Sequence, residues 1–449
     1  MVGLRLMSLF GLACMILLAW LLSERKRVVP WRVVIWGLGL QVVFGLLLLP
    51  TPFQTRVLSP LLRAVVRVVS LGRIELEQTL DELFFAGMRK AVALLTDSAL
   101  EGSRFVFGTL TEDTAVGAVF AFQVLPVIIF VSALAGVLYH LRVIHAIVRL
   151  MAWLMRRTLK TSGAETFGAA LLVFLGIESM SAIRAYLKDM TRSELCTLMT
   201  TFMATIAGSV MVVYANFGAE PGHLLAASLM SAPAAILISK LMVPETERPF
   251  TAGDRPVHLS VESHNVVDAA ARGTSEGLKM ALSVAAMVIA FIGLVYLVNV
   301  CLGVVSKPLL RLAYAPIAAR HGLPEVEALS LQSVFAAVFM PFAFLMGVPL
   351  QDTIEVARLL GTKTVLNEFL AYMEFQQVRG ALSPRSTMIA TYALCGFANP
   401  GSMGICIAGL TGLVPERRQE IVDLAVRSFI GGTLACFMTA CVAGILANA

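Results

Sequence analysis

Long apolar runs, separated by short polar and basic segments, dominate the pattern of hydrophobic and polar positions along this 449-residue chain. The first two runs cover residues 3–22 and 33–49. About 20 apolar residues are enough to cross the hydrocarbon core of a bilayer as a helix. The pattern therefore predicts membrane-spanning helices, and further spans are expected at 115–141, 191–214, 223–242, 279–304, 387–413 and 422–446.

Basic residues gather in the segments between these runs and predict the orientation of the chain. Residues 24–27 and 142–160 are rich in Lys and Arg, which concentrate on the cytoplasmic side of membrane proteins. This rule predicts an inner-membrane protein with both termini in the periplasm. Arginines recur among apolar residues in 55–75 and 143–159, which predicts amphipathic helices lying along the membrane surface.

The composition supports a membrane protein and excludes several other classes. Hydrophobic residues make up 58% of the chain and charged residues 14%, whereas soluble proteins contain about 25% charged residues. The net charge of +6 comes from the connecting segments, so it indicates topology and membrane-lipid contact rather than nucleic-acid binding. The seven cysteines form no CxxC pair, which argues against a disulfide framework or a zinc site.

Two apolar segments are interrupted by polar residues in a way that predicts re-entrant helical hairpins. Residues 161–189 are split at Gly-Ile-Glu-Ser, and residues 351–378 are split at Asn-Glu, so that each arm is too short to span. The spans that follow are also broken, at 205–209 and 396–402. A hairpin followed by a broken helix, occurring twice with opposite polarity, is typical of inverted-repeat transporters. The predicted fold is an all-α integral membrane protein with eight transmembrane helices, two re-entrant hairpins and interfacial helices.

Helix starts inside these repeats are predicted from capping patterns. Thr191 and Glu194 have the spacing of a capping box, which would begin the helix after the first hairpin. Asp352 and Glu355 have the same spacing and would cap the first arm of the second hairpin. A polar stretch at 244–273 is expected to form the longest cytoplasmic loop.

Glu178 and Glu368 stand within apolar sequence, at the two predicted hairpin tips. A charged side chain at the bilayer centre costs roughly 2.5–3.5 kcal/mol on insertion scales, unless it faces a cavity or a partner. One interpretation is that each glutamate is tied structurally to a neighbouring helix end. The alternative that two such tips favour is a polar substrate site at mid-membrane.

Seven short stretches carry a resemblance to a known family. With x for any residue, they read F-x-x-x-V-L-P at 120–126, T-S-x-A-E at 161–165, P-E-T-E at 244–247, N-V-x-D-A-A at 265–270, A-F-I-G-L at 290–294, K-T-x-x-N-E-F at 363–369 and A-L-C-G-F-A-N at 393–399. By these stretches, in this order and spacing, the chain resembles the concentrative nucleoside transporter family over nearly its whole length.

The resemblance implies a homotrimeric symporter that imports nucleosides by an elevator-like movement. Scaffold parts would comprise residues 1–160 and 244–350, and the transport domain would comprise residues 161–243 and 351–449. The resemblance implies that Glu368, Asn399 and Ser402 bind the ribose. Phe397 would line the base, and Glu178 would face the base through water. The implied substrate-binding set also includes Gly176, Ile177, Val210 and Asn367.

The chain departs from the family pattern at two places. The first hairpin tip of the family reads Gly-Gln-Ser/Thr-Glu, whereas residues 175–178 here read Leu-Gly-Ile-Glu. Base recognition is therefore expected to be looser, or aimed at a different ligand. The family's sodium site uses an Asn where this chain has Leu171, leaving Thr205 and the Ile206 carbonyl as a weak candidate sodium site.

The sequence leaves several alternatives open. The coupling ion is either H+ or Na+, and no cofactor is expected. The substrate is a nucleoside, or else a different ribosyl or sugar-like solute. A non-transporting, nucleoside-sensing membrane protein is a third reading, because an ion ligand is missing. An enzyme is not expected, since no nucleophile–base pair or metal-ligand cluster lies in the predicted spans.

Overall fold

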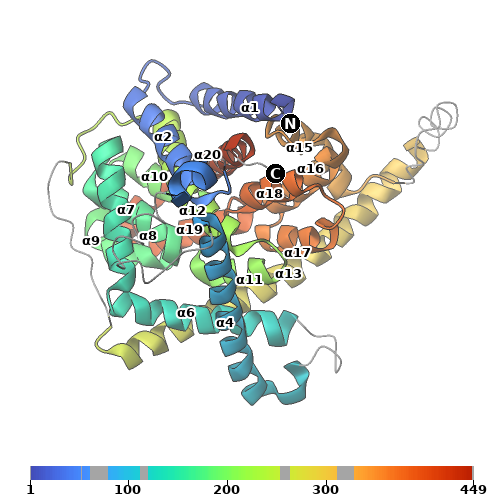
Figure 1. The fold of residues 1–449 in the computed structure, drawn as a ribbon, viewed down its shortest axis with the longest axis horizontal. Helices are drawn as coiled ribbons and strands as arrows, with labels where there is room; N and C mark the ends of the chain where they lie inside the picture. The colour runs from blue at the N-terminus through green and yellow to red at the C-terminus, as the bar shows by residue number, and fades with distance from the viewer. Residues whose placement is uncertain are drawn as a thin grey trace.

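The computed structural model describes residues 2–51, 53–60, 79–111, 120–252, 263–310 and 328–446, and these residues form helices and connecting segments without strands (Figure 1). The principal helices are α1 (Val2–Leu21), α2 (Trp31–Leu48), α4 (Leu80–Phe107), α6 (Leu125–His140), α7 (Val143–Leu159), α8 (Gly163–Leu175), α10 (Arg192–Ala204), α11 (Gly208–Asn216), α12 (Pro221–Met242), α13 (Val266–Leu309), α15 (Leu331–Leu345), α16 (Leu350–Val365), α17 (Glu368–Val378), α18 (Pro384–Leu394), α19 (Pro400–Leu413) and α20 (Arg418–Leu446).

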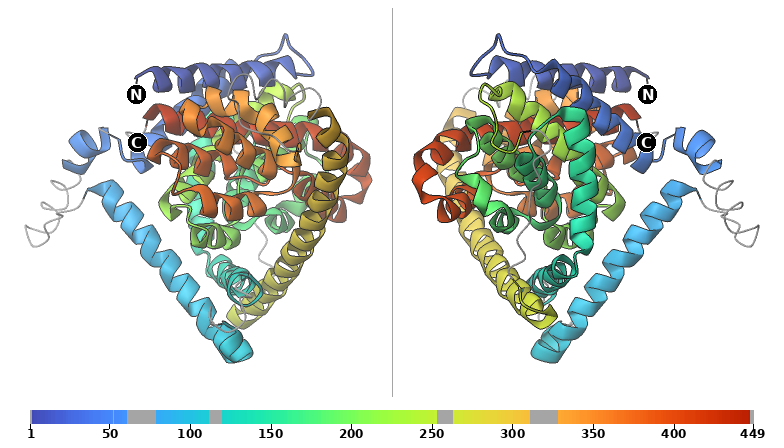
Figure 2. Two further views of the ribbon diagram at one scale, coloured as in Figure 1. Left: turned by 90° about the vertical axis from the view of Figure 1, so that its right-hand side faces the viewer. Right: turned by 90° about the vertical axis from the view of Figure 1, so that its left-hand side faces the viewer.

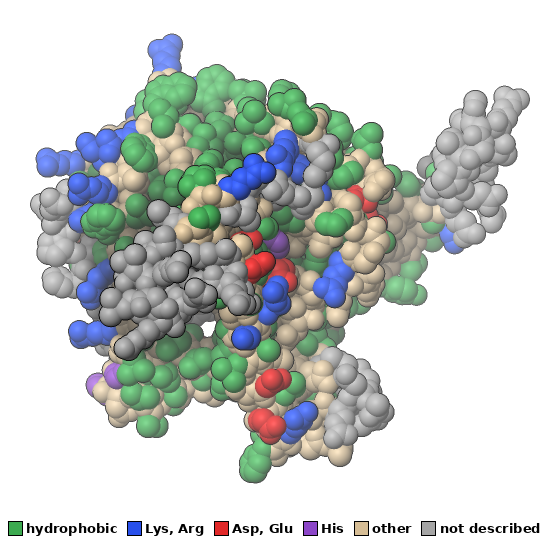
Figure 3. Space-filling view, in the orientation of Figure 1, with side chains coloured by type: hydrophobic (Ala, Val, Ile, Leu, Met, Phe, Trp, Pro, Cys, Tyr) green, Lys and Arg blue, Asp and Glu red, His purple; other side chains and the backbone are tan. Residues whose placement is uncertain are grey.

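Seven helical stretches within the described residues are long and apolar enough to cross a membrane. They match the predicted spans apart from 387–413, which is divided into α18 and α19 by the non-helical residues 395–399. Apolar side chains cover much of the face in Figure 3, including the surface over α1. Such a surface is unfavourable in water and is suited to contact with lipid.

Three peripheral helices form a frame outside the compact body. Helix α6 packs against α13 and α4, and both α4 and α13 extend away from the body (Figure 2). Helix α13 begins at Val266, where the Asn265 side chain accepts a hydrogen bond from the Asp268 backbone N–H at 2.8 Å. The prediction that the loop continues to residue 273 was therefore wrong, because this cap starts the helix earlier.

The compact body is built around α10, α12 and α20, which pack against one another. Helix α1 packs against α20, and α2 packs against α12. The predicted boundary between scaffold and transport domain at residue 160 therefore separates α1 and α2 from helices that they contact, α20 and α12. Helix α7 coincides with the predicted amphipathic segment 143–159. Most of the other predicted amphipathic segment, 55–75, lies outside the described residues.

Both ends of the first interrupted segment lie next to the N-terminus of α10. The segment consists of α8, a 3-10 helix (Ile177–Ile183) and the short α9 (Arg184–Leu187). Ser162 caps α8, and its hydroxyl also donates to the Glu194 carboxylate on α10. Glu194 in turn accepts from the Thr191 backbone N–H at 2.7 Å, which confirms the predicted capping box.

The second interrupted segment consists of α16 and α17. Both of its ends lie next to the N-terminus of α18. Asp352 on α16 accepts hydrogen bonds from the Ser383 backbone N–H at 3.1 Å and from the Ser386 hydroxyl at 2.5 Å. The predicted Asp352–Glu355 cap was wrong. Helix α16 begins earlier, after Pro349, and Asp352 instead binds the N-terminal turn of α18.

The two interrupted segments start at opposite ends of α1. Arg192, at the start of α10, pairs with Glu24 just beyond the end of α1 at 3.0 Å. Arg385, at the start of α18, donates to the Ser8 hydroxyl near the beginning of α1 at 3.0 Å. A 20-residue helix is about 30 Å long, so the two segments enter the body from opposite sides.

Candidate functional site

Glu368 is the first residue of α17, immediately after the turn that joins the arms of the second interrupted segment. Asn367 is the N-cap residue, and its side chain accepts a hydrogen bond from the Leu370 backbone N–H at 2.8 Å. Both residues are buried. Glu368 therefore lies at the positive end of a helix inside the protein.

The Glu368 carboxylate accepts hydrogen bonds from two distant helices. The Asn399 side-chain amide donates to Oε2 at 2.6 Å, and the Tyr214 hydroxyl donates to Oε1 at 2.9 Å. Asn399 is also the N-cap of α19, and its Oδ1 accepts from the Ser402 backbone N–H at 2.8 Å. The structure thus brings together three of the residues predicted to bind ribose: Glu368, Asn399 and Ser402.

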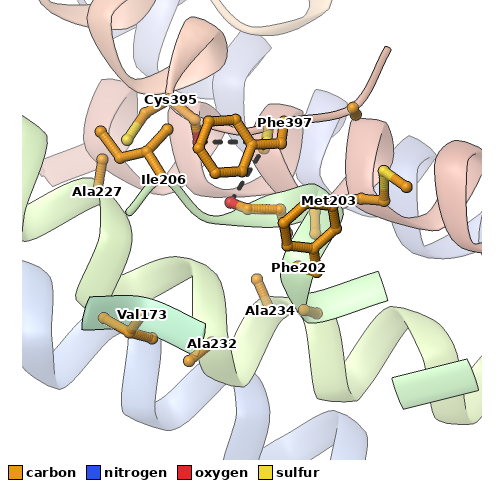
Figure 4. Packing of buried hydrophobic residues seen from close by; sticks show 14 of the residues in the cluster. Val173, Phe202, Met203, Ile206, Ala227, Ala232, Ala234, Cys395 and Phe397 are labelled. Atoms are coloured by element: carbon orange, nitrogen blue, oxygen red, sulfur yellow. Dashed lines mark hydrogen bonds between the residues drawn. The ribbon is translucent and has the colours of Figure 1, made fainter. Parts of the chain in front are cut away.

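An apolar wall lies next to the break between α18 and α19. The Phe397 ring lies 5.5 Å from the Phe202 ring, measured between centroids, and Ile206 is nearby (Figure 4). Val210, on the first turn of α11, is buried as well. These side chains are suited to contact a planar or apolar ligand group, and they offer it no hydrogen bond.

The tip of the first interrupted segment differs in chemistry from the second. Gly176 adopts φ = 78°, a left-handed conformation that glycine reaches without steric strain. Ile177 is buried and faces α19: a Cβ added at Gly409 would lie 3.0 Å from an Ile177 side-chain carbon. The side chain of Glu178 lies outside the described part of the structure, so its predicted role stays a prediction.

Residues 205–207 separate α10 from α11 and lie beside the last turn of α8. The Thr205 hydroxyl donates to the Thr201 carbonyl at 2.8 Å and lies 3.4 Å from the Leu172 carbonyl. Helices α8 and α10 both end here, and the last carbonyls of a helix carry partial negative charge. Leu171, fully buried, supplies no side-chain oxygen. The break can therefore offer oxygen ligands to a hard cation, although one fewer than an Asn would allow.

A cavity of about 150 Å³ lies beside the first tip. Helices α6 and α13 form one wall, and Leu175, Ser179 and Ser209 are among the residues that line it from the body. Leu175 and Ser179 flank the tip, and Ser209 precedes Val210. The cavity is therefore adjacent to the candidate site on the side that faces the peripheral helices.

Sequence reasoning missed two residues that lie next to the predicted ribose ligands. Lys363, on α16, is fully buried, and its Nζ donates to the Ala393 carbonyl near the end of α18 at 3.1 Å. The available signal was a lysine inside an otherwise buried arm, five residues before Glu368. Tyr214 gave no comparable signal, because a tyrosine near a helix end is common in membrane proteins.

Comparisons with known proteins identify the family. Three family profiles match: Na+ dependent nucleoside transporter N-terminus (residues 10–75), Nucleoside recognition (121–221) and Na+ dependent nucleoside transporter C-terminus (223–444). A Bacillus subtilis protein, described as the uncharacterized transporter YutK, is 38% identical over 442 residues, covering 98% of this chain and 99% of that protein. The chain belongs to the concentrative nucleoside transporter family.

Other members of the concentrative nucleoside transporter family match equally broadly. Mouse solute carrier family 28 member 3 is 38% identical over 460 residues, which include 99% of this chain and 59% of the mouse protein. The chain thus spans about three fifths of the length of that relative. A structure of CNTnw in an inward-facing substrate-bound state is 31% identical, covers 99% of this chain and 98% of its own, and superposes with a TM-score of 0.82. The chain is accordingly a multi-pass membrane protein of this family.

Proposed function

We propose that this protein is a secondary active transporter that imports nucleosides across the inner membrane, driven by a sodium gradient. The observation that carries the proposal is the Glu368 carboxylate, buried between two broken helical segments and oriented by Asn399. An ionised carboxylate accepts up to about four hydrogen bonds, so two vicinal ribose hydroxyls can bind it together. Ser402 lies one turn into α19 and would complete the ribose end.

The base end of the proposed site is apolar. Phe397, Val210 and Ile177, which would line it, are buried apolar side chains. The two polar side chains usual at the first tip are absent. Apolar contacts distinguish ligands by shape and not by hydrogen bonds, so we expect weak discrimination among bases. The same feature favours a second candidate, a ribosyl solute whose non-sugar part is not a standard base.

Sodium coupling is supported by the sodium-dependent family and by the oxygens at the α10–α11 break. Thr205, the Leu172 carbonyl and the Ile206 carbonyl would contribute ligands beside two negative helix ends. Because Leu171 supplies no oxygen, the site should bind sodium weakly.

An elevator movement of a transport domain within a homotrimer completes the proposal. Residues 161–243 and 351–449 would move against the scaffold residues 1–160 and 244–350, which include α4, α6 and α13. The opposite entry of the two interrupted segments supports re-entrant hairpins and an inverted repeat of eight crossings. Basic residues 24–27, beyond the end of α1, support a cytoplasmic α1–α2 loop and periplasmic termini.

Uptake into proteoliposomes tests the proposal directly. Purified protein would be reconstituted, sodium and proton gradients would be imposed separately, and accumulation of radiolabelled uridine, adenosine and ribose would be measured. We expect accumulation of uridine and adenosine under a sodium gradient and little response to a proton gradient. Binding of these ligands without gradient-driven accumulation would contradict a transport function, and accumulation driven by protons alone would contradict the sodium site.

A further inference from the structure

The Glu368 carboxylate has protein partners for both of its oxygens, although it is the proposed ligand for ribose. Asn399 belongs to the α18–α19 break and was expected there. Tyr214 comes from α11, in the other repeat, and is 1% exposed. Its ring stacks on Tyr372 with centroids 4.5 Å apart and an interplanar angle of 18°, which holds the hydroxyl in the direction of Glu368.

A carrier that accumulates its substrate must return empty after each release. On substrate release, the ribose hydroxyls leave Glu368, and a carboxylate without donors is costly inside a protein and more so within a membrane. Hydrogen bonds to a charged group are stronger than those between neutral groups. The return step therefore requires donors that remain in the protein, and Tyr214 and Asn399 are in the required positions.

We propose that Tyr214 is the protein's internal substitute for the substrate: in the empty site its hydroxyl satisfies Glu368 and so allows the empty carrier to return. When a nucleoside binds, ribose hydroxyls become donors to the same carboxylate, and the Tyr214 bond is no longer needed. This inference rests on the proposed role of Glu368. Tyr214 is thus a positioning residue for one half of the transport cycle and contributes little to the other half.

Two tyrosines provide a matched pair of substitutions. Tyr214→Phe removes the hydroxyl that donates to Glu368, and Tyr372→Phe removes one that donates to the Thr391 carbonyl at 3.0 Å. Both rings are fully or almost fully buried, and they stack on each other. Each variant therefore loses one buried hydroxyl from the same aromatic pair, but only the first loses a bond to Glu368.

The test compares net uptake with exchange in proteoliposomes that contain the full chain. Net uptake is measured into substrate-free vesicles, and exchange is measured into vesicles preloaded with unlabelled substrate, using radiolabelled uridine or adenosine, whichever the wild-type protein accumulates faster. Only net uptake requires the empty carrier to return. We expect Tyr214→Phe to lower net uptake on the order of tenfold, the size expected for one charged hydrogen bond, with exchange close to wild type. Tyr372→Phe should keep the wild-type ratio of the two rates.

Equal losses in both assays, or no loss in either, would overturn the role of Tyr214. Partial misfolding lowers both rates together, so the ratio is unaffected by yield. Should Tyr214→Phe not fold, Tyr214→His keeps a donor in a smaller ring, and its ratio should stay near wild type; a low ratio in that variant would contradict the inference. Glu368→Gln separates the two proposals, because unchanged net uptake and exchange in that variant would refute the ribose site itself.

Discussion

Replacing Glu368 by glutamine isolates the charge of the proposed ribose ligand while preserving its shape. In the structure Oε2 accepts from the Asn399 amide at 2.6 Å and Oε1 accepts from the Tyr214 hydroxyl at 2.9 Å. The Asn399 amide cannot turn round, because its oxygen caps α19 through the Ser402 backbone N–H. A glutamine would therefore direct its oxygen to Asn399 and its NH2 group to Tyr214, whose hydroxyl can accept as well as donate. We expect the variant to fold and assemble normally.

The cost should appear in substrate binding. A hydrogen bond to a charged acceptor contributes about 1.5–3 kcal/mol, and one between neutral groups about 0.5–1.5 kcal/mol. Two ribose hydroxyls would therefore lose roughly 2–3 kcal/mol together, or about 30–150-fold in affinity at 1.4 kcal/mol per tenfold. Uptake of nucleoside supplied at low micromolar concentration should fall to background.

The assay pairs radiolabelled uptake with calorimetric binding and size-exclusion chromatography. Glu374→Gln is the matched control, because Glu374 lies on the same helix and its carboxylate accepts only from the Thr362 hydroxyl, at 3.0 Å, among the hydrogen bonds of the described residues. The control should transport normally. Normal affinity in Glu368→Gln, or equal losses in both variants, would refute the assignment of Glu368 to the substrate.

Three further substitutions test other parts of the structure. Thr205→Val should raise the sodium concentration for half-maximal uptake about tenfold or more by removing an oxygen ligand, and Thr205→Ser should not; a sodium titration decides. Gly347→Ala should lower the melting temperature, since φ is 84° and the new Cβ would overlap a serine hydroxyl, at a cost of about 1–3 kcal/mol; Gly39→Ala, with nothing within 4 Å, should not. Lys240→Met should lower the free energy of unfolding by about 3–5 kcal/mol, because the buried Glu165 carboxylate loses its cation; in the structure Lys240 Nζ lies 2.8 Å from Glu165 Oε1. An unchanged unfolding midpoint in detergent would contradict this.

The positions of the helix interruptions could be predicted because they are local. A polar side chain within an apolar run is disfavoured in lipid, and small or capping residues beside it offer the chain a place to end one helix and begin another. Asn367 and Asn399 illustrate this, since each caps the helix that follows and so marks its own break. The same local reasoning found α7 and the capping box at Thr191.

Local reasoning failed where a side chain has a choice of partners. Thr191 and Asp352 both begin a pattern with a glutamate three residues on, but Pro349 starts α16 before Asp352 is reached. Asp352 is then already within the first turn, and its carboxylate binds Ser383 and Ser386 from α18. The partner of Glu368 was beyond prediction for a related reason. Tyr214 lies 154 residues away, and no spacing rule links residues that the fold alone brings together.

The two tips together predict which part of a substrate the proposed site distinguishes best. At the second tip a carboxylate and an amide are fixed by helix ends, and a sugar lacking hydroxyls would form none of the hydrogen bonds that ribose would form with them. Sites that hydrogen-bond a substrate hydroxyl reject analogues lacking it by up to about 10⁴–10⁵, whereas apolar pockets separate ligands by only about 10–200-fold. The first tip, with Gly176 and the buried Ile177, belongs to the second kind. Selectivity should therefore be strong for the ribose hydroxyls and weak for the base. A strong preference among bases, together with equal transport of 2′,3′-dideoxyribose compounds, would mean that the binding energy comes from the base end of the site.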